Sequence, residues 1–246
     1  MQYRNTVEFE VYGDYAMFTD PITKAGGEKY SYQVPTYQAL KGVLESVYWK
    51  PTFIWYIDEV RVMNEIRTEV KGVKLKPYAS KGSDLSYFTY LKNPRYQVRA
   101  HMEWNLNRGN LKADRNPGKH MAIANRMIEL GGRRDIFLGT RECQAYVEPC
   151  KFGSKHGFYD GKGLLDFGFM YHGIIWPDEA DVAKLEGSGD LTINFWDVIM
   201  KDGYIHFIRP QACIKRKIIH DVPVKEFGEE NNNFMSIEGD RNEFVQ

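Results

Sequence analysis

The chain of 246 residues has few cysteines and no long apolar run. Its three cysteines, at positions 143, 150 and 213, form no CxxC pair. This argues against a disulfide framework or a zinc site and favours a reducing compartment. No apolar run is long enough to span a bilayer, and the polar start MQYRNT is unlike a signal peptide. We therefore expect a cytoplasmic protein without membrane contact.

Several catalytic signatures are also missing. There is no GxSxG nucleophile elbow and no Walker-type phosphate loop. The six histidines are dispersed, and neither HxxxH nor DxD spacing occurs. We therefore expect no metal ligands and no cofactor.

The formal net charge is zero, but the charges are unevenly distributed. From Asp221 onward there are seven acidic and two basic residues, whereas Arg99 to Arg141 contains nine Lys/Arg and four Asp/Glu. A concentrated basic excess is typical of proteins that bind a polyanion. A solvated basic surface is the alternative interpretation, because charge runs alone are weak evidence.

The segment 116–141 is the most informative part of the basic region. Asn116 can cap a helix that begins at Pro117, and Gly131-Gly132 can end it. Lys119 and His120 then lie near the helix N-terminus, where the helix dipole and free N–H groups attract anions.

The element order predicts an α+β fold with a ferredoxin-like (RRM-like) βαββαβ N-terminal domain, residues 1–148. Apolar alternation predicts strands over 5–13 and 95–104, and β-branched and aromatic composition predicts one over 51–63. A further strand is expected over 142–147, and helices follow Thr36 and Asn116. On the strand 95–104 we expect Gln97, Arg99, His101 and Glu103 to form the polar face, from which Arg99 and His101 either contact RNA or are solvated. RNA-recognition modules share this order, but no aromatic RNP signature occurs.

Residues 149–220 predict a small antiparallel β domain. The stretches DFGFMYHGIIW and LTINFWDVIM read as strands, and Asp202-Gly203 predicts a hairpin turn. Residues 221–246, rich in acidic residues and asparagine, predict a disordered tail. We assign this tail no role from its sequence.

Lys119 and His120 suit RNA cleavage by attack of the 2′-OH on the adjacent phosphate. That reaction needs a base, a cation and an acid, and histidine exchanges its proton near neutral pH. The residues alone leave this open, because a Lys-His pair is more often an ordinary surface feature, and Tyr48 at a helix end can be packing.

Longer motifs make the chain resemble a known family. It is similar to the CRISPR-associated endoribonuclease of type I-C systems, Cas family five, subtype d, through about residue 216. The stretches that carry the resemblance are YGDYAMFTDP (12–21), YSYQVPTYQALKGVLESVYWKPTF (30–53), RYQVRAHMEWN (95–105) and GGRRDIFLGTRECQAYVEPC (131–150).

The resemblance implies a function and a site. It implies binding of the hairpin of a CRISPR repeat transcript, metal-free cutting at the 3′ base of the hairpin and a 2′,3′-cyclic phosphate product. The enzyme would stay on the 5′ handle of the guide and join a surveillance complex with the backbone and large subunits. The catalytic tyrosine, lysine and histidine of the family correspond to Tyr48, Lys119 and His120.

For RNA binding we predict five arginines from the basic region: Arg99, Arg115, Arg133, Arg134 and Arg141. For Arg133 and Arg134 the alternative is a structural turn with one arginine paired to Asp135. Two alternative functions stay open: a non-catalytic subunit that caps the 5′ handle, and a metal-dependent DNA nuclease.

Overall fold

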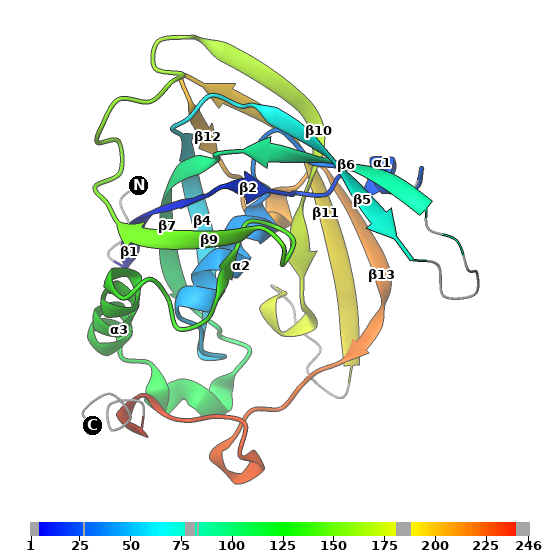
Figure 1. Cartoon of the computed structure of the whole chain (residues 1–246). Helices are drawn as coiled ribbons and strands as arrows, with labels where there is room; N and C mark the ends of the chain where they lie inside the picture. Colours follow the sequence, from blue (N-terminus) through cyan, green and yellow to red (C-terminus); the bar gives the residue numbers. More distant parts are fainter. Residues whose placement is uncertain (1–4, 27, 77–81, 83, 181–187, 240–246) are drawn as a thin grey trace.

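A nine-stranded sheet forms the body of the molecule (Figure 1). The computed structural model describes residues 5–26, 28–76, 82, 84–180 and 188–239. In this part of the chain the strands run in the order β10-β11-β12-β4-β7-β1-β9-β8, with β13 also paired to β11. All their pairings are antiparallel. The strands are β1 (Thr6–Gly13), β4 (Phe53–Val62), β7 (Arg95–Trp104), β8 (Ile136–Phe137), β9 (Gln144–Pro149), β10 (Leu164–Ile175), β11 (Ser188–Lys201), β12 (Tyr204–His206) and β13 (Lys215–Pro223).

A second, smaller sheet lies beside the first and contains β2 (Tyr15–Ala16), β3 (Lys29–Tyr30), β5 (Thr68–Leu75) and β6 (Asp84–Lys92). Among the described pairings of this sheet, the β3–β6 pair is parallel and the others are antiparallel. A four-residue helix, α1 (Pro21–Lys24), precedes β3. The architecture is therefore α+β with mostly antiparallel sheets, as the sequence predicts.

Two longer helices pack together against the large sheet. α2 (Tyr37–Val47) contacts β4, and α3 (Pro117–Glu129) contacts β1, β9 and α2. Their starts are as predicted: Thr36 Oγ1 accepts the Ala39 N–H at 3.2 Å, and Asn116 Oδ1 accepts the Lys119 N–H at 3.1 Å. Both helices bury their apolar faces in the main core.

The two ends of these helices set the positions of the candidate site residues. α2 ends at Tyr48, whose extended backbone (φ −158°) turns the chain toward β4. α3 ends before Gly131 and Gly132, which adopt φ values of +84° and +110°. Glycine suits both positions because it lacks the Cβ that makes a positive φ unfavourable for other residues. The predicted hairpin turn is confirmed as well, since Asp202 and Gly203 both have positive φ between β11 and β12.

The polar side of β7 differs from the prediction. We expected an open face from which Arg99 and His101 contact RNA or solvent, but Gln97 and His101 are buried. Gln97 Nε2 donates to the Ser154 carbonyl at 2.8 Å, and His101 Nδ1 lies 2.8 Å from Asp58. The part of the chain that follows β9 packs on this face of β7. The alternating pattern of β7 cannot predict packing by residues so far away in the sequence.

The C-terminal segment also differs from the prediction. Residues 221–239, expected to be disordered, complete β13, form a 3-10 turn (η4, Glu229–Asn231) and place Ile237 in the main core. The segment passes beside α3 and the preceding 3-10 helix η1 (Gly109–Asp114), as Figure 1 shows. Residues 240–246 of the predicted tail lie outside the described residues. No helix in the described ranges is long and apolar enough to cross a membrane.

Candidate functional site

Tyr48 and His120 meet between the end of α2 and the start of α3. The Tyr48 hydroxyl lies 2.7 Å from Nδ1 of His120. Each residue comes from a helix terminus, one fixed by the extended cap at Tyr48 and the other by the Asn116 cap. The structure therefore brings together two of the three residues predicted to be catalytic, from positions 72 apart in sequence.

Asp114 orients the imidazole of His120. The backbone carbonyl of Asp114 lies 2.8 Å from Nε2 of His120, and a carbonyl can only accept a hydrogen bond. Nε2 therefore carries a proton, so in the neutral imidazole Nδ1 accepts from the Tyr48 hydroxyl. The Asp114 carboxylate lies 3.6 Å from Nε2, where it favours an imidazolium when one forms.

Hydrogen bonds hold the Asp114 carboxylate in turn. Thr52 Oγ1 donates to one carboxylate oxygen at 2.7 Å, and the Ile237 N–H donates to the other at 2.6 Å. The contacts thus run from the C-terminal segment through Asp114 and His120 to Tyr48. Such a chain fixes the geometry of a proton-transfer pair.

Aromatic rings enclose the pair. The centre of the His120 ring lies 5.2 Å from that of Phe53 and 5.6 Å from that of Trp104. Tyr48 and His120 are both 0% exposed. Because the dielectric constant is lower away from water, electrostatic interactions within this pair are stronger than they would be on the surface.

Lys119 lies on the outer side of this pair. Its side chain is 30% exposed and forms an ion pair with Glu238 of the C-terminal segment. It is therefore the member of the predicted catalytic set that reaches solvent, and it already binds an anion. A carboxylate and a phosphate oxygen are alike in charge and in accepting hydrogen bonds.

The five predicted RNA-binding arginines divide into two groups. The guanidinium carbon of Arg133 lies 5.2 Å from the centre of the Tyr48 ring, and Arg134 and Arg141 are exposed nearby in sequence. Arg115 instead donates to the carbonyls of Asn105 and Arg108, at 2.8 and 3.0 Å. Arg99 pairs with Glu8 and Glu59, at 3.0 and 3.1 Å. The structure therefore places Arg133 beside Tyr48, whereas Arg99 and Arg115 are held by protein groups.

Comparison with known proteins places the chain in a family. Residues 6–208 match the Cas_Cas5d family model, described as CRISPR-associated protein (Cas_Cas5). The chain belongs to the Cas5d family of CRISPR-associated proteins. The family match covers Tyr48, Lys119 and His120 but stops before the C-terminal segment.

Individual family members resemble this chain over most of their length. The CRISPR pre-crRNA endoribonuclease Cas5d of Mannheimia succiniciproducens is 27% identical over 89% of this chain and 95% of that protein. Its counterpart from Thermus thermophilus is 30% identical over 58% of this chain and 63% of that protein. A crystal structure of a CRISPR-associated protein is 35% identical with a TM-score of 0.72, covering 88% of this chain and 99% of the other.

Sequence reasoning missed two residues of the site in this family member. Asp114 is the last residue of the short 3-10 helix η1, where no periodic pattern distinguishes it from its neighbours. Glu238 lies in the segment that composition assigned to disorder. A signal for Asp114 does exist, because it lies six residues before His120, within reach of a side chain at a helix start.

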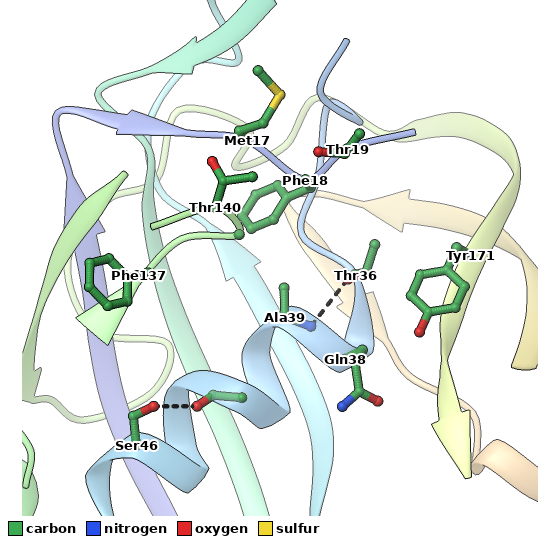
Figure 2. Close-up of a pocket in the computed structure, with 12 residues that line it drawn as sticks. Met17, Phe18, Thr19, Thr36, Gln38, Ala39, Ser46, Phe137, Thr140 and Tyr171 are labelled. Atoms are coloured by element: carbon green, nitrogen blue, oxygen red, sulfur yellow. Dashed lines mark hydrogen bonds between the residues drawn. The ribbon is translucent and has the colours of Figure 1, made fainter. Parts of the chain in front are cut away.

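A cavity of about 430 Å³ lies on another side of α2. Figure 2 shows it between α2, the loop that contains Thr140, and Tyr171 of β10. Its lining includes no Lys, Arg, His, Asp or Glu, so it offers no charged group for acid–base or phosphate chemistry. It is bounded by Gly139, where an added Cβ would lie 1.9 Å from the Met17 carbonyl oxygen. We assign no reaction to it.

Across the described part of the chain, no three His, Cys, Asp or Glu side chains gather in a group that could hold a metal ion. The three cysteines are free thiols, and burial raises the pKa of Cys150 and of Cys213 to about 11. Neither thiol is therefore a ready nucleophile at neutral pH.

Proposed function

We propose that the chain is a pre-crRNA endoribonuclease that cuts the 3′ base of the CRISPR repeat hairpin without a metal ion. The observation that carries this proposal is the 2.7 Å contact between Tyr48 and His120, with Lys119 next to it at the start of α3. The names of the two curated relatives support the substrate. The products are a 2′,3′-cyclic phosphate and a new 5′ hydroxyl.

The geometry suggests a path for the protons. Both nitrogens of His120 are engaged within the protein, so His120 reaches the RNA through the Tyr48 oxygen. The 2′-OH proton moves to Tyr48 as the Tyr48 proton moves to Nδ1 of His120. O2′ bonds to phosphorus, the bond from phosphorus to O5′ breaks, and the proton returns through Tyr48 to O5′.

Electrostatics would stabilise the two charges that form on this path. The Lys119 ammonium and the nearby Arg133 guanidinium offset the negative charge on the phosphate. The Asp114 carboxylate, 3.6 Å from Nε2, offsets the positive charge on His120. Arg134 and Arg141 would extend the cationic surface as an RNA-backbone clamp. We leave Arg99 and Arg115 out of this clamp because protein groups already hold them.

The fold supports a role as an RNA-binding subunit. Within residues 1–148, the strand order β4-β7-β1-β9 with α2 and α3 on one face supports a ferredoxin-like arrangement. We propose that the processed guide stays bound by its 5′ handle. The chain would then join a type I-C surveillance complex with the backbone and large subunits in the cytoplasm.

The test compares cutting with binding. The His120→Ala variant should lose cutting of a cognate repeat hairpin RNA and keep its affinity within about three-fold, since the outer cations remain. The exposed His156 provides the control, and His156→Ala should cut normally. Binding by the unaltered chain without any cutting would instead support a subunit that only caps the 5′ handle. DNA cutting that a chelator abolishes would support the nuclease alternative.

A further inference from the structure

The C-terminal segment contacts residues of the site but supplies no group to the proposed proton transfer. We define residues 234–239 as the C-terminal strap. An anchor precedes it: the Phe227 carbonyl accepts from Asn110 Nδ2 at 2.8 Å, and the Phe227 ring lies 5.8 Å from that of Trp49. The Met235 carbonyl then accepts from Lys50 Nζ at 2.6 Å.

The strap reaches two groups of the proposed catalytic set. The Ile237 N–H donates to Asp114 at 2.6 Å, and the Ile237 side chain is only 3% exposed. One residue later, the Glu238 carboxylate forms the ion pair with Lys119. The strap therefore sits on the side of the site where an RNA phosphate would have to approach Lys119.

The buried state of the site requires something to move before RNA can react. Tyr48 and His120 have no exposed surface, and Phe53 and Trp104 beside His120 belong to the central strands β4 and β7. Displacing those strands would disrupt the sheet. Moving the strap would instead break the Lys50–Met235 and Ile237–Asp114 hydrogen bonds and the Lys119–Glu238 ion pair, and would leave both strands in place.

We propose that residues 234–239 are an autoinhibitory strap whose Glu238 carboxylate holds the RNA-phosphate position at Lys119 until RNA displaces it. This inference rests on the proposed function of the same site. The Phe227 anchor keeps the strap close while Glu238 and Ile237 lift away, and Thr52 still donates to the Asp114 carboxylate. An acidic segment suits this role, because its carboxylate competes with phosphate and not with base contacts.

The expected size of the effect follows from exposure. Glu238 is 63% exposed in the pair, and exposed ion pairs contribute little because water and salt screen them. Removing this charge should therefore tighten RNA binding by about two- to five-fold at low salt. The gain should shrink toward nothing at high salt.

The experiment compares Glu238→Gln with Glu226→Gln in the full chain. Glu226 is an exposed acid of the same segment outside the strap, so both variants change the net charge equally. The probe is a cognate repeat hairpin RNA with a 2′-deoxy sugar at the cut for affinity, and the all-ribose RNA for single-turnover cutting. Glu238→Gln should tighten binding and speed cutting at subsaturating RNA, whereas Glu226→Gln should do neither.

The outcomes separate the strap from the reaction. Normal cutting with identical behaviour of the two variants, or slower cutting by Glu238→Gln alone, overturns the strap and leaves the nuclease in place. If the unaltered protein and both variants neither bind nor cut the RNA, the proposed function is overturned and the strap proposal with it. Amide exchange gives a second readout, because RNA should speed exchange at Ile237; slower exchange there would contradict displacement.

Discussion

The Tyr48 hydroxyl lies 2.7 Å from Nδ1 of His120, and the opposite nitrogen of the same ring lies 2.8 Å from the Asp114 carbonyl. The carbonyl assigns the proton of neutral His120 to Nε2 and leaves Nδ1 as an acceptor. Tyr48 and His120 therefore form one proton-exchanging unit with a fixed direction. Loss of either residue should disable this unit as a whole.

The first prediction concerns the hydroxyl of Tyr48. Tyr48→Phe removes one oxygen and should slow single-turnover cutting by about 10²–10⁴-fold. It should cost about 1–3 kcal/mol of folding stability, because Nδ1 of His120 loses its donor. Combining it with His120→Ala should slow cutting little further, since the two act together. The exposed Tyr146 gives the control, and Tyr146→Phe should cut normally. A double variant that multiplies the two losses would contradict a shared unit.

The second prediction separates two arginines. Arg133→Ala should weaken RNA binding about 3- to 10-fold and lower the slope of log affinity against log salt by about one, as expected for one lost phosphate contact. Arg115→Ala should leave that slope unchanged and lower the free energy of unfolding, because two carbonyls of the η1 region lose their donor. Filter binding at several salt concentrations and urea unfolding measure both. A reversed pattern would exclude this assignment.

The third prediction is a pH dependence of stability. Burial lowers the pKa of His172 from 6.5 to about 4. In the unfolded chain the residue binds a proton below about pH 6.5, whereas in the folded protein it stays neutral down to about pH 4. Folding stability should therefore fall as pH falls through this window. At 1.36 kcal/mol per pKa unit, the loss reaches about 3 kcal/mol.

Urea unfolding between pH 4 and 7 measures this effect, and the variant His172→Gln provides the comparison. Gln can still donate to the Ile208 carbonyl, which His172 Nε2 contacts at 3.0 Å, but it does not titrate. The variant should lack this part of the pH dependence. Equal slopes for the two chains would exclude His172 as its source.

The fourth prediction concerns the glycine at the cavity edge. Gly139 has a φ of +92°, and an added Cβ would lie 1.9 Å from the Met17 carbonyl oxygen. Gly161 has a φ of +71° with open space around it. Gly161→Ala should therefore cost only about 1 kcal/mol of backbone strain, and Gly139→Ala should cost more than about 2 kcal/mol. Thermal unfolding of both variants checks the order, and equal costs would show that the loop can retreat from Met17.

Local features of the sequence predicted the elements that carry the site. The caps at Thr36 and Asn116, the proline at the first turn of α3 and the glycines after it act within a few residues, so their patterns specify where the helices begin and end. Strand alternation likewise predicted β1 and β7. The family resemblance, and not any pattern, selected Tyr48 as a partner of His120.

Long-range packing explains what the sequence did not predict. The polar face of β7 was expected to contact RNA or solvent. Gln97 and His101 are instead buried under parts of the chain more than 40 residues further along the sequence. The C-terminal segment has the composition of a disordered tail, yet in its described part Ile237 lies in the main core and its N–H donates to Asp114. A single buried apolar residue produces no hydrophobic periodicity, so its burial cannot be predicted from the sequence pattern.

Metal-free attack by the 2′-OH is the central claim, and one substitution in the RNA tests it most directly. The chain is incubated in chelator with a cognate repeat hairpin, either all-ribose or with a 2′-deoxy sugar just upstream of the cut. We predict that only the all-ribose RNA is cut and that it ends in a 2′,3′-cyclic phosphate. Cutting of both RNAs would contradict attack by the 2′-OH, and binding of both without cutting would contradict the enzyme.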